Sequence, residues 1–182
     1  MLALPPCMGV VNFAASTGGR YVNTIEVHDE RRQVPYATRL AQQARESGLM
    51  QRAFFRNCVV EAWQFVCAVY PDMNKFVALP SQHRLYPNVG WTGMGVLGGI
   101  DKRTERHTDS KMGDIPGVIL VLGGNLTGGT TIYHGNSVSI KILHKNGLMH
   151  AARYGAIPHE ASDWKGLRRI ISFWVTSASS KY

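Results

Sequence analysis

The spacing of apolar residues predicts helices in the first part of the chain. Residues 35–48 have a helical composition and end at Gly48, a residue type common just after a helix. In residues 49–71 the apolar side chains recur every three or four positions: Phe55, Val59, Ala62, Val66 and Val69. This spacing predicts a second, largely buried helix. Pro71 ends it.

The pattern changes to strands from residue 76 onward. Short apolar runs such as "GVILVLGG", "TTIYHG" and "RRIISFWVTS" alternate with glycine, proline and asparagine, which is typical of a β-sandwich or barrel. Residues 10–28 predict two further strands joined by a turn. We therefore expect one α+β domain over 1–182. Its N-terminal support, about 1–75, would buttress a β-barrel core at about 76–178.

The composition agrees with one small basic domain. The 182 residues fit a single domain, and 45% hydrophobic residues are enough for a core. The formal net charge of +8 indicates an acidic partner, with nucleic acid first, although a basic charge that only aids solubility explains it equally well. We expect a monomer, while the oligomeric state stays open.

Cysteine usage and hydropathy bear on the compartment. Three cysteines without a Cys-x-x-Cys pair suggest neither a disulfide framework nor a zinc ribbon, and Cys58 and Cys67 are expected in the helical core. This indicates a reducing, intracellular environment, nuclear or cytoplasmic. The apolar N-terminus has no basic leader, so we expect no signal peptide. No apolar run is long enough to span a membrane, so no membrane partner is expected.

The segment "RHTDSK" is the candidate chemistry, because His107 and Asp109 stand two positions apart. On a strand, residues i and i+2 point to the same face, so both can contact one metal ion. An isolated pair of this kind is more often surface polar, so a third ligand is needed. The downstream histidine candidates are His134, His144, His150 and His159. His159 follows His107 by 52 residues, which leaves room for about four short strands and a return around a barrel.

The glycine run "GGNLTGG" does not predict a phosphate-binding loop. A Walker A loop needs a lysine and a hydroxyl residue after its last glycine, whereas Gly128 is followed by Gly129 and Thr130. We interpret the run as a tight hairpin connection.

Three segments in order carry a family resemblance: "HTDSK", "LGGNLTGG" and "NG…IPHEASDWKGLRR". They resemble the iron(II)/2-oxoglutarate-dependent dioxygenases, most of all the TET/JBP group, which oxidises 5-methyl groups of DNA bases. The resemblance covers residues from about 84 to 176. It implies a double-stranded β-helix, a jelly-roll or cupin-like barrel, and an oxidoreductase that uses Fe(II), 2-oxoglutarate and O2, with ascorbate as reductant in vitro.

The resemblance also implies the metal ligands. His107, Asp109 and His159 would be the catalytic triad, two histidines and one carboxylate that leave three metal positions open. His150 remains a rival ligand, although a hydrogen-bonded barrel histidine is its commoner role. His134 and His144 are expected at the rim.

The remote carboxylate of 2-oxoglutarate would need a cation on the strand after the distal histidine. Arg168 and Arg169 compete for this cofactor-binding role. Strand alternation places Arg168 and Ser172 on one face, so we favour that pair and keep Arg169 as the alternative.

For the substrate, the resemblance implies 5-methylcytosine or a related methylated base in DNA, with RNA as a further possibility. The candidate substrate contacts are Asn88 and Trp91 for a base, and Lys102, Arg103 and Arg106 for the phosphate backbone. A base in a duplex must be flipped out to reach such a pocket. Ordinary loop and core packing is the alternative role for Asn88 and Trp91.

Two other classes remain open. A hydroxylase of proteins or small molecules would share the same skeleton. A non-catalytic cupin-like binding module is the third class, and the complete ligand set together with Arg168 argues against it.

Overall fold

The computed structural model describes residues 9–14, 24–28, 53–79, 84–100, 104–123, 126–135, 137–161 and 165–175. The helix predicted at 35–48 lies outside these ranges, as do Lys102 and Arg103. The two strands predicted at 10–28 are confirmed. They are β1 (Gly9–Ala14) and β2 (Thr24–His28), which pair antiparallel.

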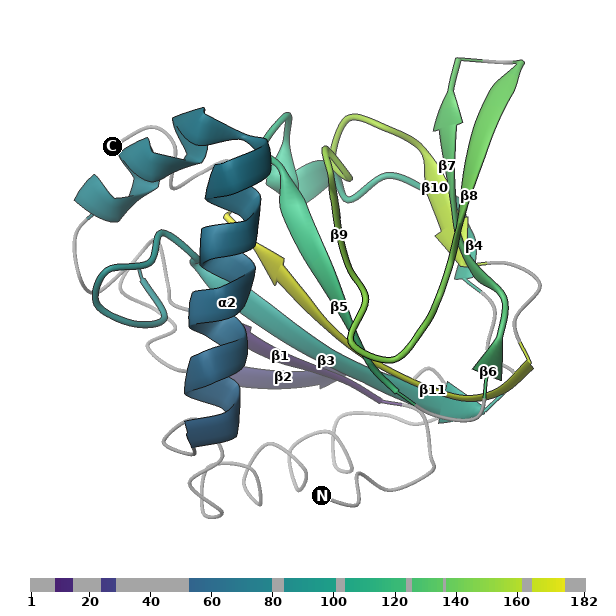
Figure 1. The fold of residues 1–182 in the computed structure, drawn as a ribbon, viewed down its shortest axis with the longest axis horizontal. Helices are drawn as coiled ribbons and strands as arrows, with labels where there is room; N and C mark the ends of the chain where they lie inside the picture. The colour runs from purple at the N-terminus through teal and green to yellow at the C-terminus, as the bar shows by residue number, and fades with distance from the viewer. Residues whose placement is uncertain are drawn as a thin grey trace.

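The strands form two antiparallel sheets (Figure 1). The major sheet has the order β2-β1-β3-β11-β5-β9, in which the last four strands are β3 (Gly93–Ile100), β11 (Lys165–Trp174), β5 (Gly117–Gly123) and β9 (Met149–Ala152). The short β6 (Leu126–Thr127) pairs with β11. The minor sheet has the order β4-β10-β7-β8, formed by β4 (Thr104–His107), β10 (His159–Ala161), β7 (Gly129–His134) and β8 (Val138–Leu143).

The chain passes repeatedly from one sheet to the other. It runs from β3 in the major sheet to β4 in the minor sheet and returns to the major sheet at β5. After β7 and β8 in the minor sheet it alternates again through β9, β10 and β11. The seven-stranded major sheet and the four-stranded minor sheet, connected in this way, form a double-stranded β-helix of the jelly-roll type, so the predicted α+β fold class is confirmed.

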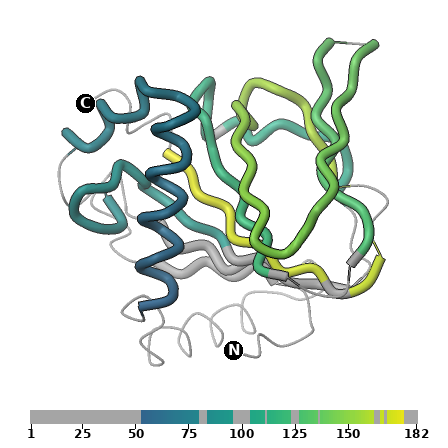
Figure 2. The backbone as a smooth tube through the Cα atoms, viewed as in Figure 1, coloured from purple at the N-terminus to yellow at the C-terminus, as the bar shows by residue number. Residues whose placement is uncertain are grey.

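Helix α2 (Ala53–Val69) covers the outer face of the major sheet (Figure 2). The predicted apolar stripe is confirmed at Phe55, Val59, Ala62 and Val66, which are buried against the sheet. Val69 is 50% exposed, contrary to the prediction, because the helix ends there and the chain turns into the 3-10 helix η2 (Pro71–Ala78). The helices in the described part of the chain are too short or too polar to cross a bilayer.

Alternation along the strands divides the core into two clusters. Ile171 and Phe173 of β11 join the outer cluster with α2, whereas Ile170 joins an inner cluster between the two sheets. On β5, Leu120 likewise packs outward and Ile119 inward. The face assignment made from the sequence for β11 therefore holds, and Arg168 lies on the inner face with Ile170.

The hairpin predicted for "GGNLTGG" is wrong. The strands on either side lie in different sheets, since β5 pairs with β11 and β9 while β7 pairs with β10 and β8. The run is thus a crossover between sheets. Gly129 is required by close packing, because a Cβ atom there would lie 1.9 Å from the carbonyl oxygen of Ile142.

Two valines one turn apart test the packing of α2. Val66 is fully buried and Val69 is half exposed. Val66→Ala should lower the free energy of unfolding by about 2 kcal/mol through lost burial and a cavity. Val69→Ala should change it by less than about 0.5 kcal/mol. Urea denaturation of both variants measures this, and equal losses would contradict the assigned helix face.

Candidate metal centre

Strand pairing places two histidines from distant parts of the sequence side by side. His107, the last residue of β4, is the direct cross-strand partner of His159, the first residue of β10. Directly opposed residues point to the same face of a sheet. The two rings accordingly lie 4.4 Å apart between centroids, tilted by 52°.

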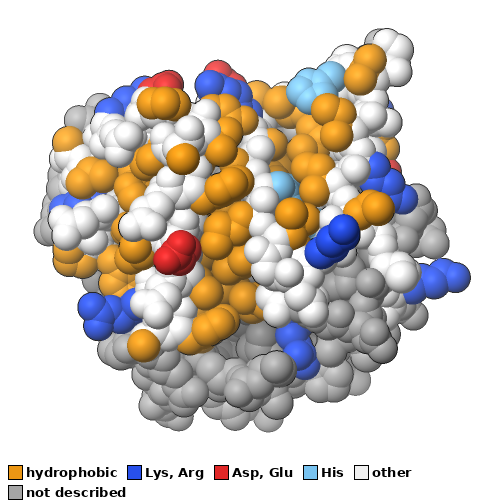
Figure 3. All heavy atoms as spheres, viewed as in Figure 1, with side chains coloured by type: hydrophobic (Ala, Val, Ile, Leu, Met, Phe, Trp, Pro, Cys, Tyr) orange, Lys and Arg blue, Asp and Glu red, His pale blue; other side chains and the backbone are white. Residues whose placement is uncertain are grey.

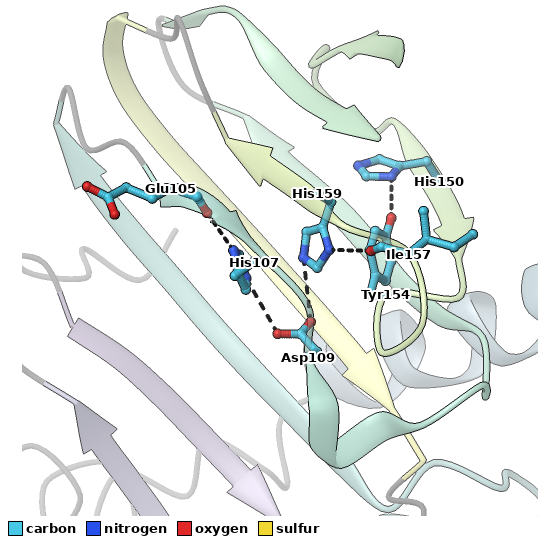
Figure 4. Close-up of polar contacts among 7 residues, drawn as sticks. All are labelled: Glu105, His107, Asp109, His150, Tyr154, Ile157 and His159. Atoms are coloured by element: carbon cyan, nitrogen blue, oxygen red, sulfur yellow. Dashed lines mark hydrogen bonds and ion pairs between the residues drawn. The ribbon is translucent and has the colours of Figure 1, made fainter. Parts of the chain in front are cut away.

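Asp109 completes the group just beyond the end of β4 (Figure 4). Its backbone N–H donates to the carbonyl of Tyr154 at 2.9 Å, and its own carbonyl accepts from the N–H of Met112 at 2.8 Å. These two bonds fix the backbone on both sides of the side chain. Asp109 Oδ1 lies 3.5 Å from His107 Nε2, and Oδ2 lies 3.7 Å from His159 Nε2.

Backbone carbonyls fix the orientation of both imidazoles. His107 Nδ1 donates to the carbonyl of Glu105 at 2.7 Å, and His159 Nδ1 donates to that of Ile157 at 3.2 Å. A carbonyl can only accept, so in each neutral ring the lone pair is on Nε2, facing Asp109. The ligand atoms lie within 4.8 Å of one another. Two imidazole nitrogens and a carboxylate oxygen oriented by such outer bonds fit a divalent transition metal.

The centre is buried on one side and open on the other. The side chain of His159 is 8% exposed, whereas those of His107 and Asp109 are 38% and 43% exposed. Burial lowers the pKa of His159, and the bond to Ile157 and the carboxylate of Asp109 oppose that shift. The neutral ring is the form that binds a metal, and the open side leaves room for further ligands.

Arg168 is the buried cation of the barrel interior. It is 7% exposed on the inner face of β11, while Arg169 is half-buried on the opposite face. Burial lowers the pKa of Arg168 to about 10, and the Tyr154 hydroxyl opposes this shift. Ser172, on the same face, donates to the carbonyl of Gly95 at 3.4 Å.

The remaining predicted substrate contacts are dispersed. Trp91 is fully buried between Trp63 and Phe173, so its assignment as a base contact gives way to the alternative of core packing. Asn88 is exposed in a turn with φ 64°, a conformation that asparagine tolerates. Arg106 is exposed and lies over the ring of Tyr133, 4.1 Å from its centroid.

Three further histidines take different places. His134 is exposed, as predicted for a rim residue. His144 is buried, contrary to the rim prediction, because the chain crosses from β8 to β9 and carries it into the interior beside His150. His150 accepts a hydrogen bond from the Tyr154 hydroxyl at 2.6 Å. It stands outside the group of three candidate ligands, so it is the hydrogen-bonded barrel histidine that the sequence favoured.

An apolar extension of the ligand row was not found from the sequence. His159 pairs with Ile132 of β7, and Ile132 pairs with Ile140 of β8, so these residues share one row and one face with His107. Ile132 is buried, but Ile140 is 51% exposed. Val138, two residues before Ile140 on that face, is 55% exposed. The alternation of "VSIKIL" identifies the face, but only the strand pairing shows that the metal centre lies on it.

No protein-family model and no curated protein matches the sequence. Solved structures show a distant likeness. They include an oxidoreductase of the 2OG-Fe(II) oxygenase family from Burkholderia pseudomallei, with 10% identity over 91% of this chain and 65% of that one, at a TM-score of 0.48. A Trichoplax adhaerens prolyl hydroxylase, bound to a peptide of hypoxia inducible factor, has 22% identity over 51% of this chain and 46% of that one, at 0.38.

A third is the CENP-C cupin domain of Drosophila melanogaster, with 12% identity over 45% of this chain and 59% of that one, at a TM-score of 0.33. The chain spans less than two thirds of each of these three proteins. At identities of 22% or less such likeness concerns the fold alone. The chemistry of the site therefore rests on the residues of this chain alone.

The ligand set predicts how metal binding responds to substitution. Asp109→Ala should weaken Mn(II) binding more than about 100-fold, because even the outer partners of metal ligands contribute 10–100-fold. His134→Ala, at an exposed histidine of the neighbouring β7, is the matched control and should bind as the wild type does. Isothermal titration calorimetry gives both affinities. Undiminished binding by the double variant His107→Ala/Asp109→Ala would remove the metal assignment.

Proposed function

We propose that this chain is an iron(II)- and 2-oxoglutarate-dependent oxygenase that oxidises a C–H group of its substrate. The observation that carries the proposal is the triad of His107, Asp109 and His159, with both Nε2 lone pairs facing the carboxylate. Two histidines and one carboxylate on one side of a metal are the ligand set of non-haem iron(II) oxygenases. Iron held there would supply the oxidation of the C–H bond by O2, coupled to decarboxylation of the 2-oxo acid.

The residues of the chain position the reactants. The Asp109 backbone is held by Tyr154 and Met112, so the base of its side chain is fixed beside the two imidazoles. The buried guanidinium of Arg168 supplies the charge that a remote carboxylate needs in a dry interior. Because water is excluded around His159 but not around His107, the substrate is expected to approach over His107 and the exposed side of the centre.

For the substrate, we propose a methylated base in DNA, 5-methylcytosine first. The net charge of +8 supports a polyanionic partner. Arg106, next to His107, stands at the surface with its guanidinium over Tyr133. Lys102 and Arg103, four and three positions earlier in the sequence, are the other proposed phosphate contacts.

Hydroxylation of a protein or small molecule is the second candidate, and the apolar residues beside the ligand row favour it. Ile140 and Val138 are exposed on the face that carries the ligands. Figure 3 shows hydrophobic side chains over much of the visible surface, while the Lys and Arg side chains stand apart from one another. An apolar group could be held there without phosphate contacts.

The cosubstrate assignment predicts unequal roles for two neighbouring arginines. Arg168→Ala should weaken 2-oxoglutarate binding to the Mn(II)-loaded protein by about 2–5 kcal/mol, the cost of truncating one partner of a buried charge pair. Arg169→Ala, on the other face, is the matched control and should have a small effect. Calorimetry separates the two. A larger loss for Arg169→Ala would mean that Arg169, and not Arg168, binds the cosubstrate. If neither variant weakens binding, the assignment of a 2-oxo acid as cosubstrate is wrong.

The DNA assignment predicts a salt-dependent affinity and an oxidised product. Binding of a 5-methylcytosine duplex should weaken with salt, with a log–log slope near −0.9 per phosphate neutralised. Lys102→Ala/Arg103→Ala should flatten that slope by about 1–2 units. Fluorescence anisotropy measures the slope, and mass spectrometry after incubation with Fe(II), 2-oxoglutarate and ascorbate detects the product. Binding that ignores salt, with no oxidised base, would favour the protein or small-molecule substrate.

A further inference from the structure

A chain of buried polar rings extends from the metal centre into the barrel. The centroid of the Tyr154 ring lies 4.8 Å from that of His159 and 6.1 Å from that of His150. The centroids of the His150 and His144 rings are 5.5 Å apart. Tyr154, His150 and His144 are all buried. Polar atoms in a protein interior are normally hydrogen-bonded, so each nitrogen of these rings requires a partner.

One hydrogen bond fixes which nitrogen of His150 carries its proton. The Tyr154 hydroxyl and His150 Nδ1 lie 2.6 Å apart, and among the described residues this is the only hydrogen bond of that hydroxyl. The Tyr154 hydroxyl is a phenol, which keeps its proton at neutral pH. Burial, helped by His144, lowers the pKa of His150 to about 3, so the ring is neutral. The phenol therefore donates to Nδ1, and the single N–H of the ring is on Nε2.

The Nε2–H of His150 is a buried donor for which no described residue provides an acceptor. A buried donor left in this state carries an uncompensated desolvation penalty. A ligand that enters the barrel with a hydrogen-bond acceptor could therefore bind to this N–H group. Because the ring is neutral, it offers one directed hydrogen bond rather than a charge.

The same face of the major sheet supplies a cation. His150 of β9 pairs with Ile119 of β5, which pairs with Ser172 of β11, so His150 and Ser172 lie in one row and point inward. Arg168 is four residues before Ser172 on that face. Its charge is near enough to lower the pKa values of both His150 and His144. The Nε2–H of His150 and the buried guanidinium of Arg168 thus both face the interior of the barrel.

We propose that the Nε2–H of His150, held in this tautomer by Tyr154, donates to the remote carboxylate of the cosubstrate that Arg168 binds. His150 is then a specificity-determining residue that selects a dicarboxylic 2-oxo acid over one with an apolar end. The inference rests on the proposed function and extends it to residues of β9 and of the turn after it. Tyr154 acts through His150 and is a positioning residue.

The test compares two ligands that differ only at the remote end. 2-Oxoglutarate carries the second carboxylate, whereas 2-oxopentanoate ends in a methyl group. Calorimetry on the Mn(II)-loaded protein gives the affinity for each. Any general damage to fold or metal site weakens both ligands, while loss of the His150 bond weakens 2-oxoglutarate alone.

Two amide substitutions separate the two ring nitrogens. His150→Gln places an amide N–H near the position of Nε2 and should bind 2-oxoglutarate within about fivefold of wild type. His150→Asn reaches only the position of Nδ1 and should weaken 2-oxoglutarate about 10- to 100-fold, the range for a hydrogen bond to a charged group. Neither should change the affinity for 2-oxopentanoate. Tyr154→Phe should give a smaller, selective loss, because the ring can then adopt either tautomer.

The outcomes distinguish this inference from the function on which it rests. Equal affinity of His150→Asn and wild type for 2-oxoglutarate would overturn the role of His150, and so would a parallel loss for both ligands. If Arg168→Ala still weakens 2-oxoglutarate selectively, the proposed oxygenase stands without it. Failure of the wild-type Mn(II) protein to bind 2-oxoglutarate would remove both.

Discussion

The cross-strand pair of His107 and His159 is the contact on which the site depends. These residues are 52 positions apart in the sequence, and only the antiparallel pairing of β4 with β10 brings their rings to 4.4 Å. A slip of one residue in that pairing would turn one imidazole to the opposite face of the minor sheet. The double-stranded β-helix sets this register, because β10 is held between β4 and β7 on its two edges.

The two faces of the major sheet have separate tasks. The outer face is covered by α2 and packs with Trp91 and Phe173 into the larger core, which is the structural support. The inner face mixes apolar residues such as Ile170 with the buried Arg168 and His150. Polar and charged groups are costly in such an interior unless they serve a partner. The inner face therefore carries the groups on which the proposed binding of an anion rests.

The β7–β8 end of the minor sheet projects beyond the major sheet (Figure 1). That is why Ile132 is buried while Ile140, in the same row, is half exposed. The metal centre lies at the boundary between these regions. A cosubstrate anchored in the interior and a substrate approaching from the open side would meet there.

The sequence by itself determined the helix face at Phe55 to Val66, the strand pattern and the inward direction of Arg168, because periodicity along one element requires no knowledge of its neighbours. It also supplied the three candidate metal ligands, His107, Asp109 and His159, through the order of its motifs. Three features depended on tertiary structure: the interior position of His144, the burial of Trp91, and the crossover at "GGNLTGG". So did the row from His107 to Ile140 and the tautomer of His150. Each of these is set by which strands become neighbours, and that follows from the closure of the two sheets rather than from any local pattern.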